Sequence, residues 1–238
     1  MWGEEGGEKE TDALDPGSAA FYSNLPQPYV TQVGEHILSL IQHLEDFAAS
    51  NALEDVEPLT TSGVMDRLVE PDWRGAAQAL GMSEAETSAF LRAIAAPTAA
   101  TTTSSGCSSS SAVTPKDEEK DDDAAARFTN LWVHAISQAT VALLLRAVLA
   151  GLPRLSNKGL QQLQTDAQYL LTVFDNLALP PHPILTHLHT VAGWTEEELR
   201  GHIEGGRAGR KEGGIAAMQW RVERRMAELR GILVTFHG

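Results

Sequence analysis

The chain has 238 residues, of which 42% are hydrophobic and 6% aromatic, and its formal net charge at pH 7 is −14. Plentiful Ala, Leu, Glu, Gln and Arg, with few β-branched runs, favour an all-α fold that can bury a core. The overall acidity argues against general binding to a phosphate backbone, which needs a concentrated basic surface, so we expect no nucleic-acid partner.

The charge is unevenly distributed along the chain. Residues 1–15 carry six acids against one lysine, and residues 116–123 carry six acids against two lysines. From Arg200 onward the sign reverses, with eight Arg or Lys residues against four acids. This basic end is compatible with an acidic partner or an anionic membrane surface, but a solvated, arginine-rich helix face is the simpler interpretation.

The chain's one cysteine and its apolar runs suggest a cytosolic setting. Cys107 lies in a serine-rich run, and a single thiol can form neither an intrachain disulfide nor a zinc site by itself. The first fifteen residues are acidic and Gly-rich, unlike a signal peptide. The longest apolar run, 139–152, is interrupted by Arg146 and is shorter than the ~20 residues of a membrane span. We therefore expect a soluble, cytosol-facing chain.

Residues 1–20 are predicted to be a disordered acidic N-terminus, and residues 21–238 to form one helical domain. The first helix is expected to open at Pro26 or Pro28, since proline fits the first helical turn, and to hold its apolar period for five turns. A weak short helix is expected around Val64–Leu68.

The next predicted helices have recognisable starts. Asp72 can cap a short helix through Leu80, because its side-chain oxygen accepts from unpaired amides of the first turn. Ser83 and Glu86 form a capping box, S-x-x-E, at the start of a helix that runs to about Ile94.

Residues 97–126 turn to Ala, Thr and Ser and then to a charge block. Such a segment buries too little apolar surface to offset the entropy lost on ordering, so we expect a disordered insertion within the domain. A strong helix follows over Phe128–Leu149. Its expected buried side consists of Phe128, Leu131, Trp132, Ala135, Ile136, Ala139, Leu143, Ala147 and Val148.

The clearest helix is predicted over Leu155–Leu179. Ser156 or Asn157 can cap its start, and Pro180 and Pro181 stop it. Its apolar stripe recurs at steps of three or four and consists of Leu160, Leu163, Ala167, Leu170, Val173, Phe174 and Leu177. A stripe without a reactive group is typical of a packing and assembly protein rather than an enzyme.

Three shorter helices complete the predicted all-α, multi-helix bundle. They are expected at Ile184–Val191, from Thr195 onward, and at Met218–Leu229. A glycine-rich, flexible break separates the last two at 201–214.

The histidines raise the only question of a metal. His182, His187 and His189 lie within eight residues, but positions 187 and 189 are about 200° apart on a helix and cannot hold one ion from the same face. Cys107 lacks a positioned base. We therefore expect no cofactor and no catalytic residue. A metal-dependent hydrolase using the three histidines stays an alternative, and a generic acidic helical adaptor is another.

Some residues are candidates for core or interaction roles. Asp166 is predicted to be a buried, hydrogen-bonded structural acid, with a solvent-side position as the alternative. Trp132 and Tyr169 are predicted to be core residues or interface anchors. The full set is Tyr29, Ile37, Leu44, Trp132, Ile136, Leu163, Asp166, Tyr169, Leu170, Val173 and Leu177.

Three segments, taken in order, carry a resemblance to a known family. The first is SNLPQPYVTQVGEHILSLIQHLEDF, with Tyr29 after a proline, then Gly34 and an Ile37–Leu40 run. The second is NLWVHAISQAT, and the third is LSNKGLQQLQTDAQYLLTVFDNLALPP. Together they resemble the C-terminal region of subunit 7 of the conserved oligomeric Golgi complex, over roughly 22–50 and 128–190.

The resemblance implies a function as well as a fold. That family consists of longer chains with an N-terminal coiled-coil region and helical rods, so this chain looks like its terminal bundle alone. Family members are non-enzymatic parts of a Golgi vesicle tether that acts in retrograde transport. The implied partners are the other subunits, SNAREs and Rab GTPases. The implied location is the cytosolic face of the Golgi apparatus membrane, peripherally, through the complex.

Overall fold

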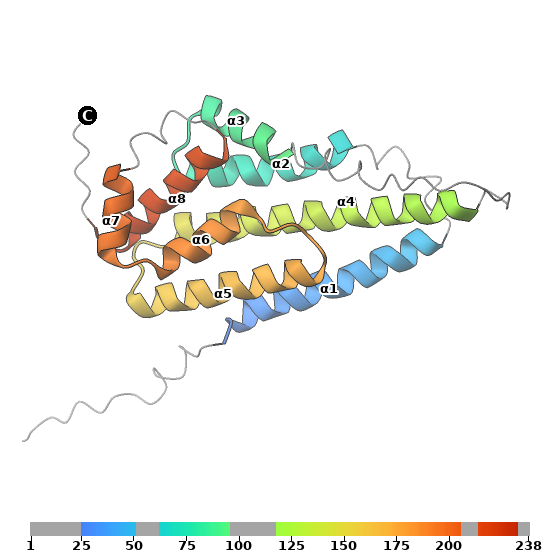
Figure 1. Ribbon diagram of the computed structural model, residues 1–238, viewed down its shortest axis with the longest axis horizontal. Coiled ribbons are helices and arrows are strands. Elements are labelled where there is room, and N and C mark those ends of the chain that lie inside the picture. The colour runs from blue at the N-terminus through green and yellow to red at the C-terminus, as the bar shows by residue number, and fades with distance from the viewer. Residues whose placement is uncertain (1–24, 51–61, 96–117, 206–213, 233–238) are drawn as a thin grey trace, which may run out of the picture.

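The computed structural model describes residues 25–50, 62–95, 118–205 and 214–232 (Figure 1). Every regular element in these ranges is a helix, so the predicted all-α fold class is confirmed. The predicted disordered N-terminus 1–20, Cys107 and most of the glycine-rich break lie outside the described residues. In chain order the elements are α1 (Pro28–Ala49), α2 (Ser62–Ala79), α3 (Glu84–Ala95), α4 (Glu118–Leu145), η4 (Arg146–Ala150), α5 (Asn157–Asn176), α6 (Pro183–Gly193), α7 (Glu196–Gly205) and α8 (Ile215–Leu229).

Helix α1 starts at the second of the two predicted prolines. Pro28 occupies the first turn, where a missing amide donor costs nothing. Its buried row faces α4 and α5, with which α1 makes most of its contacts, and Figure 1 shows α1 beside them. That row includes Val30, Ile37 and Ile41.

Helix α2 corrects the prediction of two short helices in this region. It runs without a break from Ser62 to Ala79, although Pro71 lies inside it. A proline in a helix interior normally costs ~3 kcal/mol, because it removes one hydrogen bond and clashes with the preceding turn. Here Trp73, Ala76 and Ala77 are fully or almost fully buried on the face that packs on α4, and this burial offsets the cost.

The start of α4 corrects part of the predicted insertion. The helix begins at Glu118, so residues 118–126 are helical, while 97–117 lie outside the described residues. Acidic residues stabilise the positive end of a helix dipole, and Ala124–Ala126 are the strongest helix formers. These two properties favour a helix in a segment whose charge suggested disorder.

The buried face of α4 also differs from the prediction. Leu143 is 50% exposed, whereas Val141, Ala142 and Leu145 are fully buried. The segment 139–150 is apolar nearly all round, so its periodicity does not specify one face. Contacts with α2 and α1 decide which side is buried.

Helix α5 has the predicted N-cap, but it ends at Asn176, before the predicted Leu179 and the two prolines. The Ser156 hydroxyl accepts a hydrogen bond from the Gly159 amide at 3.2 Å, so Ser156 is the N-cap. At the other end the Leu179 amide donates to the Phe174 carbonyl at 3.0 Å, and the Ala178 amide donates to the Asp175 carbonyl at 2.9 Å. These two bonds form a Schellman motif, which places its next-to-last residue in the left-handed region.

Ala178 occupies that left-handed position with φ of 53°. In the equivalent motifs that end α2 and α8, the left-handed position is occupied by Gly81 and Gly231. An L-residue with a Cβ is strained there by about 1 kcal/mol. We expect Ala178→Gly to raise the free energy of unfolding by about 0.5–1 kcal/mol, despite the greater flexibility of glycine in the unfolded chain. Urea denaturation at constant m-value measures the change, and a variant less stable than the parent would contradict it.

One connected hydrophobic core draws residues from every helix of the described ranges. Its largest fully buried side chains include Trp73, Phe90, Phe174, Leu149 and Met218. Figure 1 shows α2, α3 and α8 on one side of α4 and α1 and α5 on the other. The segment Phe128–Ala150, at 23 residues, is the one described stretch long and apolar enough to cross a membrane by length and composition alone, and 44% of its most apolar window is buried in the protein.

Candidate functional site

A buried polar contact between distant segments lies where α5 meets the start of α1. Asp166 is 3% exposed, and its Oδ1 accepts hydrogen bonds from the Gln27 amide at 2.8 Å and from Gln162 Nε2 at 2.9 Å. Gln162 Nε2 also donates to the Leu25 carbonyl at 3.0 Å. We call these residues, with Tyr169 and Gly34, the α1–α5 junction.

Asp166 therefore acts as the side-chain cap of another helix. The Gln27 amide directly precedes α1, and amides at a helix start lack partners within the helix. Burial raises the pKa of the Asp166 carboxyl above its usual value, although its hydrogen bonds from Gln27 and Gln162 oppose that shift. The predicted buried, hydrogen-bonded role of Asp166 is confirmed, and the solvent-side alternative is wrong.

Two further residues of the junction allow α1 and α5 to approach closely. A Cβ added at Gly34 would lie 2.6 Å from the Tyr169 hydroxyl and 2.7 Å from its ring carbon Cε1. The same hydroxyl donates to the Thr31 carbonyl at 3.4 Å. Glycine at position 34 is thus what leaves room for the Tyr169 ring against α1.

A shallow groove of about 390 Å³ lies beside the junction. Its lining contains no carboxylate and no lysine or arginine, and Asp166 does not take part in it. The ionisable side chains of the lining are Tyr169, whose hydroxyl donates to the Thr31 carbonyl, and His189. Its lining residues are Pro26, Gln164, Thr165, Gln168, Tyr169 and His189.

A second buried polar network joins α2, α4 and α6. Gln138 Oε1 accepts from Trp73 Nε1 at 3.1 Å and lies 2.9 Å from His182 Nε2. An indole nitrogen can only donate, so the Gln138 atom must be its oxygen and His182 Nε2 must carry the proton. His182 Nδ1 then accepts from the amides of Ile184 and Leu185, both at 3.3 Å.

His182 is therefore the N-cap of α6 rather than a free base. His182 is buried, at 5% exposed, and is stacked on Trp73 with ring centroids 5.5 Å apart. Burial, together with the nearby His134, lowers the pKa of His182 to about 3. The imidazole is neutral at pH 7, with both nitrogens already engaged.

The other two histidines have different surroundings. His187 Nε2 lies 3.0 Å from Glu223 Oε1 of α8, and its ring meets Trp194 edge to face. His189 lines the groove beside the junction. No group of three His, Cys, Asp or Glu side chains in the described ranges is placed to hold a metal ion, and these histidines do not converge.

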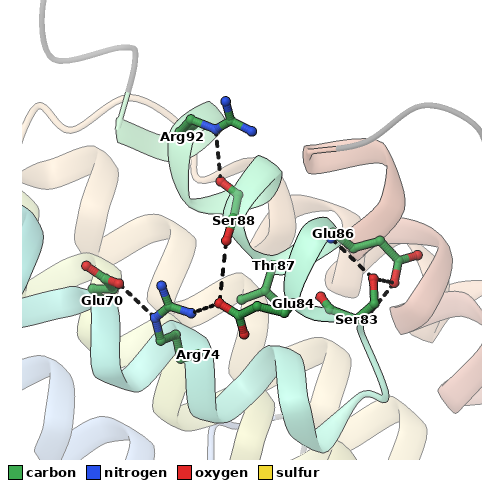
Figure 2. Close-up of polar contacts among 8 residues, drawn as sticks. All are labelled: Glu70, Arg74, Ser83, Glu84, Glu86, Thr87, Ser88 and Arg92. Carbon is green, nitrogen blue, oxygen red and sulfur yellow. Dashed lines mark hydrogen bonds and ion pairs between the residues drawn. The ribbon is translucent and has the colours of Figure 1, made fainter.

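The capping box predicted at Ser83 is confirmed, and it forms part of a charged surface over α2, α3 and α8. Figure 2 shows Glu86 reaching back to the Ser83 amide, at 2.7 Å, while the Ser83 hydroxyl accepts from the Glu86 amide at 3.3 Å. Arg74 of α2 lies between Glu70 and Glu84 in the same view. Arg221 of α8 pairs with Glu86 at 3.1 Å, which joins α3 to α8.

The basic residues of α8 make intramolecular contacts. Arg225 donates to the Leu149 carbonyl at 2.6 Å and to the Leu152 carbonyl at 3.0 Å, where η4 ends. Arg224 and Arg225 both pair with Glu228. These arginines line a groove of about 520 Å³, but their charges are matched by carboxylates and carbonyls of the chain itself. Arg221 and Arg225 therefore hold α8 against α3 and η4, whereas Arg207, Arg210 and Lys211 lie outside the described residues.

The candidate core and interaction residues fall into three groups. Five are buried, namely Ile37, Leu163, Asp166, Leu170 and Val173. Five are partly buried and pack on the core or at the junction, namely Leu44, Trp132, Ile136, Tyr169 and Leu177. Tyr29 is 55% exposed, which suits an interaction rather than a core role.

Sequence reasoning missed Gln138, Gln162 and Trp73 as members of buried networks. Two of them lie next to a predicted apolar stripe and carry amide groups that suggest solvent exposure. A glutamine one position from a stripe otherwise made of apolar residues is a weak signal of a buried network. Asp166, the partner of Gln162 within α5, is four residues away, but the partners that join these side chains to other elements lie 44 to 137 residues away, where no local pattern identifies them.

No protein-family model, no curated protein and no solved structure matches this chain.

Proposed function

We propose that the chain is a non-enzymatic subunit, or C-terminal module, of the conserved oligomeric Golgi vesicle-tethering complex. It acts in retrograde transport within the Golgi apparatus and in Golgi organisation. In this proposal its helices form the bundle that ends a rod. The other subunits bind it directly, SNAREs and Rab GTPases are further partners, and the complex holds it at the cytosolic face of the membrane.

One observation carries the proposal. The segments of the resemblance are far apart in sequence, yet the first contacts both of the others, because α1 packs on α4 and on α5. Residues within the resemblance make the contact at the junction, where Asp166 caps α1 and Tyr169 lies against Gly34. Because the three segments pack together as one unit, there is a structural reason for them to occur together in one chain.

The use of the buried polar groups supports a structural rather than a catalytic role. Asp166 caps α1 and His182 caps α6, while Gln138 and Gln162 connect helices. A catalytic acid or base needs a nitrogen or oxygen atom that has no other hydrogen-bond partner and that faces the substrate site. These four side chains instead direct their polar atoms at the protein's own backbone and side chains.

The test is recovery of named partners from cells. The tagged full chain, expressed in cells depleted of their own subunit 7, is expected to lie at the Golgi and to co-purify the other subunits of the complex. A folded chain that recovers none of them would contradict the tether and favour the generic acidic adaptor. Leu170→Asp serves as the unfolded control.

A further inference from the structure

Helix α1 carries two parallel rows of mainly apolar residues, and only one of them is buried. The inner row runs through Val30, Ile37, Ile41 and Leu44 and packs on the core. The outer row begins one residue earlier and repeats with steps of four and three. Its members are Tyr29, Val33, His36, Leu40, His43 and Phe47.

The outer row has the spacing of a coiled-coil seam and is open to solvent. Alternating steps of four and three correspond to the a and d positions of a heptad. Tyr29 is 55% exposed, Val33 40% and Phe47 39%, although one edge of the Phe47 ring meets Phe128 of α4. The apolar members Tyr29, Val33, Phe47 and the partly buried Leu40 alternate with His36 and His43, and exposed apolar residues that share one face of a helix are typical of an interaction surface.

The charges of α1 indicate what covers this row. The helix contains Glu35, Glu45 and Asp46 and no lysine or arginine. The residues that precede each member of the row lie on its solvent side, and they include Glu35 and Asp46. A second copy of α1 would bring no lysine or arginine to these acids, whereas a helix with basic flanks would pair with them.

We propose that the outer row of α1 is the docking surface for an amphipathic helix of another subunit, with apolar residues at its a and d positions and Lys or Arg beside them. The partner's class rests on the proposed function, because a rod-forming tether is built from such helices. The assignment of the surface is based on the exposed heptad row and on the acidic residues beside it.

The experiment uses the purified full chain and two labelled synthetic peptides of about three heptads, ~21 residues. Both have Leu at a and d, and the flanking positions are Lys and Arg in one and Glu in the other. Fluorescence anisotropy is expected to detect binding of the basic peptide alone. Val33→Glu and Leu40→Glu are expected to weaken it by at least about tenfold, since each places a charge in the seam.

A matched control lies on the same helix. Leu38 is 38% exposed, close to the 40% of Val33, but it is about 140° round the helix from Val33. Leu38→Glu is expected to leave peptide binding unchanged. Circular dichroism and melting of each variant separate lost binding from lost folding.

Several outcomes would overturn the proposal. Equal binding of both peptides would show that the charges of α1 do not select the partner. If Leu38→Glu weakened peptide binding as much as Val33→Glu, the outer row would not be the binding surface. Sedimentation that shows a dimer abolished by Val33→Glu would assign the row to a second copy. Peptide binding without recovery of Golgi subunits would refute the tether but keep the surface, and subunit recovery unaffected by Val33→Glu would refute the surface alone.

Discussion

Replacing Leu170 by aspartate is expected to unfold the protein at room temperature. Leu170 lies in the middle of α5, is 2% exposed and belongs to the central core. Removing a buried leucine costs about 2–5 kcal/mol, and burying an unpaired carboxylate adds several more. A domain of this size is usually stable by only about 5–15 kcal/mol, so the sum is comparable with the whole free energy of unfolding.

Far-UV circular dichroism and thermal melting measure this loss. Gln168→Asp is the matched control, because position 168 lies on the same helix, is exposed and receives the same new charge. We expect that control to melt within a few degrees of the parent, since exposed substitutions usually change stability by about 0.5 kcal/mol or less. An unchanged melting curve for Leu170→Asp would show that α5 does not bury this face in solution.

The parts of the fold that sequence reasoning predicted well depend on local chemistry. The start of α5 follows from Ser156, whose hydroxyl caps the helix that begins at the next residue. The start of α3 follows from Ser83 and Glu86, three residues apart in a capping box. A hydrogen bond between residues three positions apart can be recognised from a four-residue pattern.

The parts that it missed depend on partners far along the chain. The α2 helix continues through Pro71 because Trp73 is buried on α4, and nothing in the local pattern contains that information. Gln138 is joined to Trp73, 65 residues away, and to His182, 44 residues away. In such cases tertiary contacts outweigh the local preference of each residue.

The candidate site was predictable only in part, for the same reason. A lone acid in an apolar helix must have a partner if it is buried, and that argument identified Asp166 as structural. Gln162 lies four residues earlier on the same helix, whereas the Gln27 amide comes from the start of α1, 139 residues away in sequence. The identity of a buried polar residue can thus be predicted from sequence, whereas a distant group that satisfies it cannot.

Acidification is expected to destabilise the protein through His182. Its pKa is about 3 in the folded protein and near 6.5 in the unfolded chain, because burial disfavours the imidazolium. Below pH 6.5 the unfolded state therefore binds a proton that the folded state does not. The free energy of unfolding falls by at most ~1.4 kcal/mol per pH unit between pH 6.5 and about 3, which amounts to about 2 kcal/mol by pH 5.

Urea denaturation of the parent and of His182→Asn between pH 7.5 and 5 measures this contribution. Asparagine keeps a side-chain acceptor at the start of α6 but does not titrate, and it is among the preferred N-cap residues. We expect the variant to be less stable at pH 7.5, because it loses the stacking on Trp73 and weakens the contact with Gln138, but to change little down to pH 5. Carboxylates such as Glu86 and Glu198, whose pKa values lie below the usual range because of hydrogen bonds from Ser83 and Thr195, titrate at lower pH in both proteins. Parallel pH profiles would show that His182 accepts its proton in the folded state, and the buried network that joins α2, α4 and α6 would then have to be open to water.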